Sequence, residues 1–548
     1  MPSLDELIVA IWQRVVRMRA RSPRRLAVLA ATAALVGVVL AWYFRPWLHG
    51  IVYGIYTTPI VPLAVVLGIG ITLFVRRQFG ALAGGQIGIT VVVLVLVVGA
   101  GGAGLLAGED LGKRTIDTAT SAENLSETDP TKPRVVPKSV ASRYASNTLN
   151  FPQYRVTDGD ITVRNGTPYW SYALAPDGAF NYYTKQQHGT VLVDMTEQNA
   201  EVDTVVGDFR KGIGPAFYNN YRFTMLKRGN YLVNYEDPYL VVHGGEQHIA
   251  VPYTKPEFHW LPLPYTTPEW GGVVLIDRDG TVEDLSPQAA RNHPALQEQK
   301  LYPFELARQK VAATKYRNGI VNTFTSHRDE VEVAPVPGED NDQPFLVFTE
   351  DGPQYVVAVE PYGQAQGLKE VWTIDGRTGE YEVYAPTESL FGARKATDYV
   401  RQAARTTDWN RFTPSEPIPV VVDGQLYWEV RVVPTDSSGI AYTAFVNARS
   451  SDVHEVSTTP EVTAFLEGRN VTTQPADTSG DDGQTPSLVI ERVAPNGTVV
   501  ETLEIYGNET VRIVQGNTTN ATATTTTANA TATTTTANGS ATTATSNG

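Results

Sequence analysis

The chain has 548 residues, of which 44 are Lys or Arg and 58 are Asp or Glu, and it contains no Cys. This length is too great for one hydrophobic core, so several domains are expected, and the missing Cys excludes disulfides, thiolate metal sites and a cysteine nucleophile. Residues 1–107 hold nine Arg and two acidic residues, which leaves residues 108–548 with a net charge of −21 and a surface that repels nucleic acid.

Long apolar runs near the N-terminus predict a membrane anchor of three helices over residues 26–107. None of the runs contains a charged side chain, and each is long enough to cross a hydrocarbon core of about 30 Å. The three predicted transmembrane helices cover residues 26–44, 51–75 and 87–107.

Two features of these runs allow other interpretations. The first run resembles the apolar part of a signal peptide, but Trp42, Tyr43 and Phe44 stand where a cleavage site needs small residues. Pro59 and Pro62 interrupt the second run, which a neighbouring helix in a membrane can compensate. Both runs are therefore kept as spans.

Basic residues around the runs predict the orientation of the anchor. Residues 1–25 carry six Arg and the second loop carries Arg76 and Arg77, whereas the first loop has only Arg45. The N-terminus is therefore expected in the cytoplasm, with the ectodomain outside the plasma membrane or a membrane-derived envelope. The basic segment 1–25 has apolar residues at helical spacing, which fits an interfacial helix or a cytosolic extension of the first span.

Composition divides the remaining chain into an ectodomain, two linkers, a small cap and a tail. The linkers are rich in Pro, or in Gly and acidic residues, and the tail consists only of Thr, Ala, Asn, Gly and Ser. Such a tail buries nothing and is expected to be disordered. The predicted boundaries are 108–138 for the first linker, 139–330 and 331–468 for the ectodomain, 469–486 for the second linker, 487–516 for a β cap and 517–548 for the tail.

One strand pattern occurs four times in the ectodomain. A strand with Gly and Tyr is followed by a Pro/Gly turn, a strand that ends in Asp or Asn, a short turn and an acidic strand. Alternating apolar residues, clearest in residues 427–433, predict half-buried strands. The Asp or Asn positions are Asp194, Asp277, Asp375 and Asn447.

Helices are predicted at residues 304–317 and 390–406, where apolar residues recur every three or four positions. They precede the third and fourth copies of the strand pattern. A helix followed by an antiparallel hairpin, repeated along the chain, predicts an α+β fold class with two such units in each part of the ectodomain.

The repeated unit resembles PepSY-type modules, in which a helix packs on a curved antiparallel sheet. The resemblance is clearest from Trp372 to Glu380 (WTIDGRTGE), which is similar to that family's strand and Asp-x-x-Thr-Gly-Glu turn. The first and fourth copies lack the Thr-Gly-Glu. In this turn Gly379 is expected at positive φ, and Asp375 is expected to bond to the backbone.

Nine Asn-X-Ser/Thr sequons predict N-glycosylation. The four in the Thr-rich tail resemble the glycosylated stalks of archaeal surface proteins, and a flexible tail without sugar is the alternative. The candidate acceptors are Asn124, Asn165, Asn470, Asn496, Asn508, Asn517, Asn520, Asn529 and Asn538.

No catalytic or cofactor-binding motif occurs in the sequence. His243, His248 and His259 form the one group of histidines that could bind a metal, with Glu246 or Glu257 as a further ligand. Their spacing matches no zinc motif, and a strand, turn and strand are expected around the first two, so no metal site is predicted. A segment starting at Asp277 (DRDGT) imitates a calcium loop but lacks its later ligands, so a β-turn is expected there.

These features predict a non-enzymatic, glycosylated membrane protein of a cell surface or envelope. Its expected partners are the lipid bilayer and an extracellular protein or further copies of itself, with no nucleic acid and no cofactor. The chain has an excess of acidic residues and only 12 Lys, none of them after Lys395. This composition resembles that of haloarchaeal proteins, and the alternative interpretation is an acidic protein of a mesophile. Because PepSY modules often accompany extracellular peptidases, the resemblance implies an alternative function as a peptidase inhibitor or chaperone.

Overall fold

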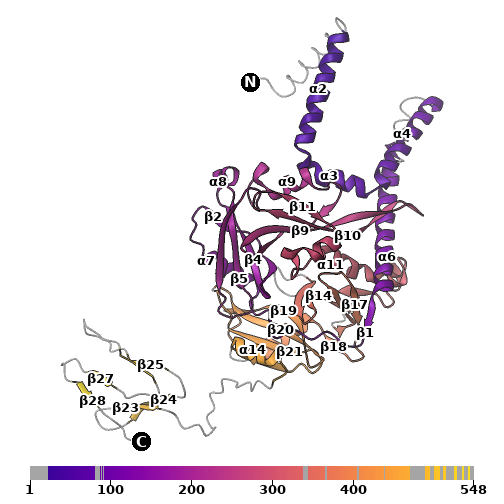
Figure 1. Ribbon diagram of the computed structural model, residues 1–548. Helices are drawn as coiled ribbons and strands as arrows, with labels where there is room; N and C mark the ends of the chain where they lie inside the picture. Colours follow the sequence, from indigo (N-terminus) through magenta and orange to yellow (C-terminus); the bar gives the residue numbers. More distant parts are fainter. Residues whose placement is uncertain are drawn as a thin grey trace. The chain divides into compact units, whose positions relative to one another are not determined.

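The computed structural model describes residues 23–79, 87, 89–90, 92–336, 343–363, 367–403, 407–436 and 438–469, together with six short strands between residues 488 and 543 (Figure 1). The chain divides into two compact units, Met1–Thr473 and Gln474–Gly548. Residues 1–22 of the predicted segment 1–25 lie outside the described part of the chain.

The N-terminal apolar runs are helical. They form α2 (Pro23–Tyr43), α3 (Arg45–Thr57), α4 (Ile60–Phe79), the π-helical turn η1 (Val95–Gly99) and α6 (Ala100–Thr118). In the described part of the chain two stretches, Ile60–Gln78 and Val92–Thr118, are long and apolar enough to cross a membrane. A third span requires that Ala31–Tyr43 and Arg45–Thr57, which are bent by 88°, count together.

The start of the predicted second span is wrong. Residues 51–57 belong to α3, and the second long apolar helix begins only at Ile60. Between the two helices Thr58 has φ −119° and ψ 73°, because the residue before Pro59 is driven out of the α region. A proline that was expected to be tolerated inside one helix therefore separates two.

The predicted linker 108–138 contains regular structure and several buried residues in the body of the molecule. Helix α6 continues to Thr118, and β1 (Thr120–Ala122) pairs in parallel with β17 (Tyr381–Tyr384). Val135 and Val136 are fully buried, and both of their N–H groups donate to the Met195 carbonyl oxygen, at 2.8 and 3.0 Å. The Pro-rich composition predicted a loop and did not reveal these buried positions.

Four modules, each a helix followed by a four-stranded antiparallel meander, form the body of the first compact unit, so the α+β fold class is confirmed. Module 1 has α7 (Lys138–Asn147), β3 (Asp160–Arg164), β4 (Thr167–Pro176), β5 (Gln187–Asp194) and β6 (Val202–Phe209). Module 2 has α9 (Tyr221–Arg228), β8 (Tyr239–His243), β9 (Glu246–His259), β10 (Tyr265–Asp277) and β11 (Val282–Leu285). Module 3 has α11 (Phe304–Ala313), β13 (Phe345–Thr349), β14 (Gly352–Pro361), β16 (Glu370–Asp375) and β17. Module 4 has α13 (Ala393–Ala403), β19 (Phe412–Val422), β20 (Gln425–Pro434), β21 (Tyr442–Asn447) and β22 (Val453–Val456).

Short elements complete the modules. Strands β2 (Tyr154–Val156), β7 (Asn234–Tyr235) and β12 (Val331–Val333) pair with β4, β9 and β14, and β15 (Gly367–Leu368) pairs with β18 (Leu390–Phe391). The short helices are α8 (Ala179–Thr184), η2 (Phe217–Asn219), α10 (Pro287–Asn292), η3 (Pro294–Leu296), η4 (Thr314–Asn318), α12 (Asn322–Thr325) and α14 (Thr459–Leu466). The helix predicted at residues 304–317 is confirmed as α11 and η4. The one predicted at 390–406 starts as β18 and becomes α13.

Turn chemistry explains why the pattern repeats. In modules 1, 2 and 4 the first two strands are joined by Asn165-Gly166, Gly244-Gly245 and Asp423-Gly424, all at positive φ, as two-residue hairpins of this handedness require. Between the last two strands of module 3, the Asp375 carboxylate accepts from the N–H groups of Arg377 and Thr378, at 2.6 and 2.8 Å. Gly379 has φ +74°, so the predicted turn is confirmed.

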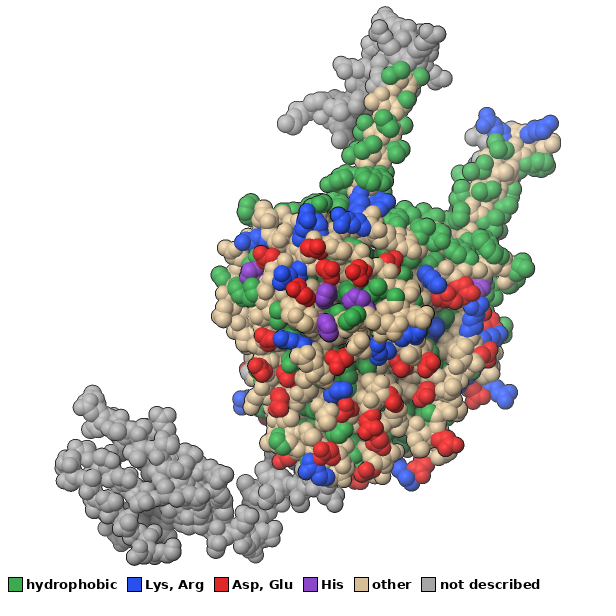
Figure 2. All heavy atoms as spheres, in the orientation of Figure 1, with side chains coloured by type: hydrophobic (Ala, Val, Ile, Leu, Met, Phe, Trp, Pro, Cys, Tyr) green, Lys and Arg blue, Asp and Glu red, His purple; other side chains and the backbone are tan. Residues whose placement is uncertain are grey.

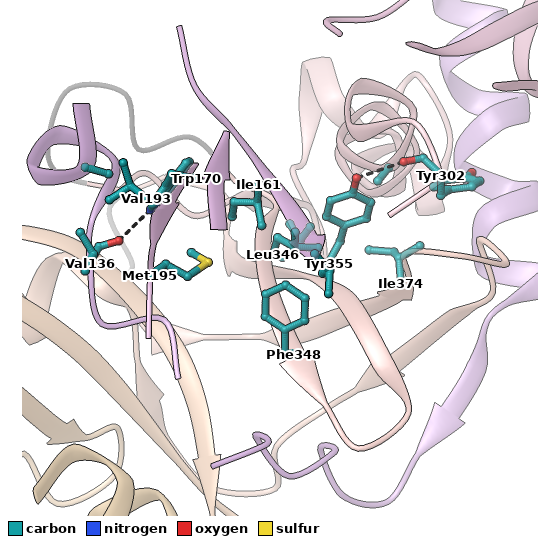
Figure 3. Packing of buried hydrophobic residues seen from close by; sticks show 14 of the residues in the cluster. Val136, Ile161, Trp170, Val193, Met195, Tyr302, Leu346, Phe348, Tyr355 and Ile374 are labelled. Carbon is teal, nitrogen blue, oxygen red and sulfur yellow. Dashed lines mark hydrogen bonds between the residues drawn. The ribbon is translucent and has the colours of Figure 1, made fainter. Parts of the chain in front are cut away.

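The modules share hydrophobic cores and so form one body. One cluster joins Trp170 and Met195 of module 1 to Leu346 and Tyr355 of module 3 (Figure 3). The Trp170 indole N–H donates to the Val136 carbonyl at 2.8 Å. A second cluster joins the sheets of modules 3 and 4. The linker and three sheets therefore fold together.

The second compact unit contains β23 (Leu488–Val493) and β24 (Val499–Ile505), which form the hairpin expected of the cap. Strand β25 (Thr510–Ile513) pairs with β26 (Thr524–Thr527), and β27 (Thr533–Thr535) pairs with β28 (Ala541–Thr543). These pairs place short strands in the tail that was predicted to be disordered. The other residues of the tail lie outside the described part of the chain.

Candidate functional site between the first three modules

A cavity of about 680 Å³ lies where modules 1, 2 and 3 meet. Module 1 contributes the start of β3 and the side chains that flank it, module 2 contributes β7 and β8, and module 3 contributes the start of α11 and part of β13 and β14. The polar side chains of its lining include Arg134, Lys138, Asp158, Asp160, Glu236, Tyr239, Lys300 and Tyr355.

Most charges around the cavity are paired. The Lys300 ammonium lies 2.5 Å from the Asp160 carboxylate, and the Lys138 ammonium lies 2.9 Å from that of Asp158. Lys300 also stands 5.4 Å from the centre of the Tyr239 ring, whose hydroxyl donates to the Lys300 carbonyl at 2.5 Å. Together these contacts fix Lys300 between a carboxylate and an aromatic face.

Glu236 is the carboxyl of the cavity whose pKa lies near neutrality. Burial raises its pKa to about 7, because desolvation disfavours the carboxylate. Its oxygens accept from the backbone N–H groups of Glu305 and Leu306 at 3.2 and 3.3 Å, which are in the first turn of α11. Glu236 therefore accepts hydrogen bonds from N–H groups in the first turn of α11, and these bonds connect module 2 to module 3.

The lining of the cavity is polar, and most of its charges are already paired. The paired Lys and Asp groups make the lining polar, whereas Tyr239 and Tyr355 are each only 1% exposed and pack in the wall of the cavity. General acid–base chemistry needs a titrating group free to approach the reacting atom, and the oxygens of Glu236 are bonded to the backbone of α11.

The histidines considered from the sequence lie elsewhere. His243 is the last residue of β8 and pairs with Glu246 across the tight turn, so the predicted strand, turn and strand are confirmed. The His248 ring lies 2.7 Å from the Asp277 carboxylate, and the His259 ring lies 2.9 Å from the Thr267 hydroxyl. Among the described residues no group of three or more potential ligands is placed to hold a metal ion.

The structure describes the segment that imitates a calcium loop and two of the nine sequons. The segment starting at Asp277 forms the turn between β10 and β11, with the Gly280 N–H donating to the Asp277 carbonyl at 2.9 Å, as a β-turn predicts. Asn124 is exposed, and Asn165 is exposed in the turn between β3 and β4. The remaining seven sequons lie outside the described residues.

Sequence reasoning did not single out Asp160, Glu236 or Lys300. They lie far apart in the chain, belong to no motif and come together only because three modules fold against each other. Asp160 and Glu236 lie at strand ends, a position that acidic residues occupy in many parts of this chain, and Lys300 has no local signal.

Comparisons with known proteins add little. No protein-family model and no curated protein matches the chain. Among solved structures, a "putative glycoside hydrolase from Parabacteroides distasonis ATCC 8503" is similar over 61% of this chain and 83% of its own, with 10% identity and a TM-score of 0.18. A likeness of that size carries no argument about fold or function.

Proposed function

We propose that this chain is a non-enzymatic membrane protein that displays an acidic, glycosylated ectodomain on a cell surface or on an envelope derived from one. Its N-terminus lies in the cytoplasm. The ectodomain binds another protein, mediates adhesion or assembles laterally with further copies.

The observation that carries this proposal is the way α6 joins an apolar helix to the body. The stretch Val92–Thr118 has 27 residues, about 40 Å of helix, whereas a hydrocarbon core is about 30 Å thick. The surplus enters the body, where Leu111, Gly112 and Thr115 are buried. A helix that is apolar outside the body and packed inside it is expected of a rigidly held membrane anchor.

The distribution of basic residues supports the orientation. Arg76 and Arg77 lie in the last turn of α4, at the end remote from the body, where Figure 2 shows basic side chains. Arg24 and Arg25 likewise lie at the start of α2, whose other end meets the body. Because basic residues favour the cytoplasmic side, the body is expected outside.

The absence of Cys makes a direct test of topology possible. Single variants Ser3→Cys and Ser450→Cys are treated in intact cells with a maleimide that cannot cross membranes. Labelling of Ser450→Cys alone, with Ser3→Cys labelled only after lysis, is the expected result. Labelling of both, or of Ser3→Cys alone, in intact cells would contradict the orientation.

Two further measurements test whether the ectodomain is glycosylated and which protein it contacts. Asn124→Gln and Asn165→Gln should each increase electrophoretic mobility if their exposed side chains carry glycan, and unchanged mobility in both would remove glycan from the described surface. Crosslinking on intact cells should then capture either copies of the chain or an envelope or adhesion partner. Capture of an extracellular peptidase would instead favour the regulatory function that the PepSY resemblance implies.

A further inference from the structure

Helix α3 has one face docked on the body and an opposite face that the described residues leave largely exposed. Its docked face makes specific contacts. The His49 ring lies 3.0 Å from the Val233 carbonyl oxygen, and the Tyr231 hydroxyl donates to the Arg45 carbonyl at 2.6 Å. Its opposite face exposes Trp47, Ile51 and Ile55, with 65% of Ile51 accessible.

The direction of that open face follows from the bend. Helix α3 turns by 88° from α2, and α4 starts three residues after α3 ends, so α3 runs across the body between the feet of α2 and α4. Figure 1 shows α2 and α4 projecting from the same side of the body, with α3 lying along it. The open face of α3 therefore points away from the body, on the side from which α2 and α4 project.

Side chains from distant segments extend this open face at both ends. At one end the Trp47 ring is 5.1 Å from the ring of Phe217, which is 5.5 Å from that of Tyr183. At the other end the Tyr56 ring is 5.0 Å from that of Phe258, which is 6.0 Å from that of Trp260. The series thus reaches from α8 and η2, across α3, to the connection between β9 and β10.

These segments expose large apolar side chains that the body does not bury. Helix α8 has no buried residue and leaves 78% of Phe180 accessible, and Leu261 at the tip of the long β9–β10 hairpin is 85% accessible. We call Phe180, Tyr183, Phe217, Tyr218, Trp260 and Leu261 the apolar collar. Leu263, next to it, lies against Gly102 of α6, so the collar reaches a further apolar helix.

We propose that the apolar collar and the open face of α3 sit in the interfacial layer of the lipid bilayer, so that the ectodomain rests on the outer leaflet instead of standing away from it. This inference depends on the proposed function, in which the apolar helices span that membrane. It assigns the first crossing to α2 alone, whose 21 residues are long enough, and not to α2 and α3 together. The occupant is a lipid surface because the collar is continuous with those helices and is rich in Tyr and Trp, which favour the interface.

Charge supports the same occupant. The Lys227 ammonium stands 4.3 Å from the centre of the Trp42 ring and donates to the Trp42 carbonyl at 2.6 Å, and Arg45 lies beside the Tyr231 ring. Figure 2 shows basic and hydrophobic side chains together at the foot of the projecting helices, with acidic side chains spread over the body farther away. Lys227 and Arg45, at the foot of these helices, have the charge that attracts lipid phosphates, whereas the chain after residue 107 has more acidic than basic residues.

The test places single cysteines in the full chain, which has no Cys of its own, and attaches a nitroxide in lipid nanodiscs. Phe180→Cys and Leu261→Cys report on the collar. Leu35→Cys in α2 is the reference for lipid. Ser450→Cys, in the turn after β21 of module 4, is the reference for water, because Figure 1 draws β21 at the end of the body away from α2 and α4.

The readout is the ratio of nitroxide accessibility to oxygen, which concentrates in lipid, and to a water-soluble nickel complex. Both collar variants should show a ratio several-fold above that of Ser450→Cys and below that of Leu35→Cys. Collar ratios equal to that of Ser450→Cys, with Leu35→Cys in lipid, would overturn the collar proposal and leave the anchor intact. Water-like behaviour of Leu35→Cys would overturn the anchor and the collar together. Collar sites shielded from both reagents would indicate a protein contact and also overturn it.

Discussion

Gly379 shows at the scale of one residue why the turn of module 3 has its sequence. The backbone there has φ +74°, and a Cβ would lie 2.3 Å from ring atoms of Tyr302. Gly379→Val should therefore lower the free energy of unfolding by about 2–4 kcal/mol, combining backbone strain with overpacking. Chemical denaturation of the full chain in nanodiscs would measure it.

A matched glycine separates the two causes. Gly424 also has positive φ, +70°, but a Cβ there meets nothing within 4 Å. Gly424→Ala should cost only the backbone strain, about 1–2 kcal/mol. Glu380→Gln, at an exposed position of the same turn as Gly379, should change little. Gly379→Ala should lose more stability than Gly424→Ala, because its Cβ also meets the Tyr302 ring. Equal losses for these two variants would show that contact with Tyr302 does not matter.

Glu236 makes a residue-scale prediction about pH. Its pKa in the folded state is about 7 because of burial, against 4.5 for an ordinary Glu. The unfolded state therefore ionises first as pH rises, so the stability that Glu236 contributes is complete below pH 4.5 and is lost by about pH 7. Glu236→Gln cannot ionise and should gain about 3 kcal/mol relative to the unmodified chain between pH 4.5 and 8.

The control for that prediction is Glu236→Ala. It removes the acceptor for the Glu305 and Leu306 N–H groups and should be destabilised at every pH. Parallel stability profiles of the unmodified chain and Glu236→Gln would show that the carboxyl does not titrate in this range.

At the scale of elements, the contact between α6 and α11 decides how firmly the body is joined to the apolar helices. Gly112 allows the close approach, since a Cβ there would lie 2.1 Å from the Ala313 carbonyl oxygen. Gly112→Ala should lower stability by about 1–3 kcal/mol through overpacking, although Ala is the better helix former. Thermal unfolding in nanodiscs would test this.

Gly104 in the same helix provides the comparison. A Cβ at Gly104 meets nothing within 4 Å, so Gly104→Ala should keep or raise stability by up to about 1 kcal/mol. If both substitutions raise the melting temperature equally, α6 does not pack on α11 as closely as described.

At the scale of the whole molecule, the excess of acidic residues predicts salt-dependent stability. Residues 108–548 carry a net charge of −21, and their mutual repulsion reaches about 10 Å at 0.1 M salt but only about 3 Å at 1 M. The melting temperature of the full chain should therefore rise with KCl from ~0.1 to ~3 M. A flat or falling melting temperature would argue against a halophilic origin.

The sequence by itself determined the local features of this protein. Apolar runs predicted the N-terminal helices, and alternation with Gly and Asp turns predicted the repeated hairpins, including positive φ at Gly379. These features depend on neighbours within a few residues, so the sequence carries them directly.

Only the tertiary structure decided the features that depend on distant contacts. The packing of Val135 and Val136, the meeting of Glu236 with the start of α11, and the 88° bend that lays α3 across the body were not predicted. Each depends on contacts between segments far apart in the chain. No local periodicity encodes such contacts, because the same Pro, Glu or apolar residue is equally compatible with a loop, a solvated surface or a straight span.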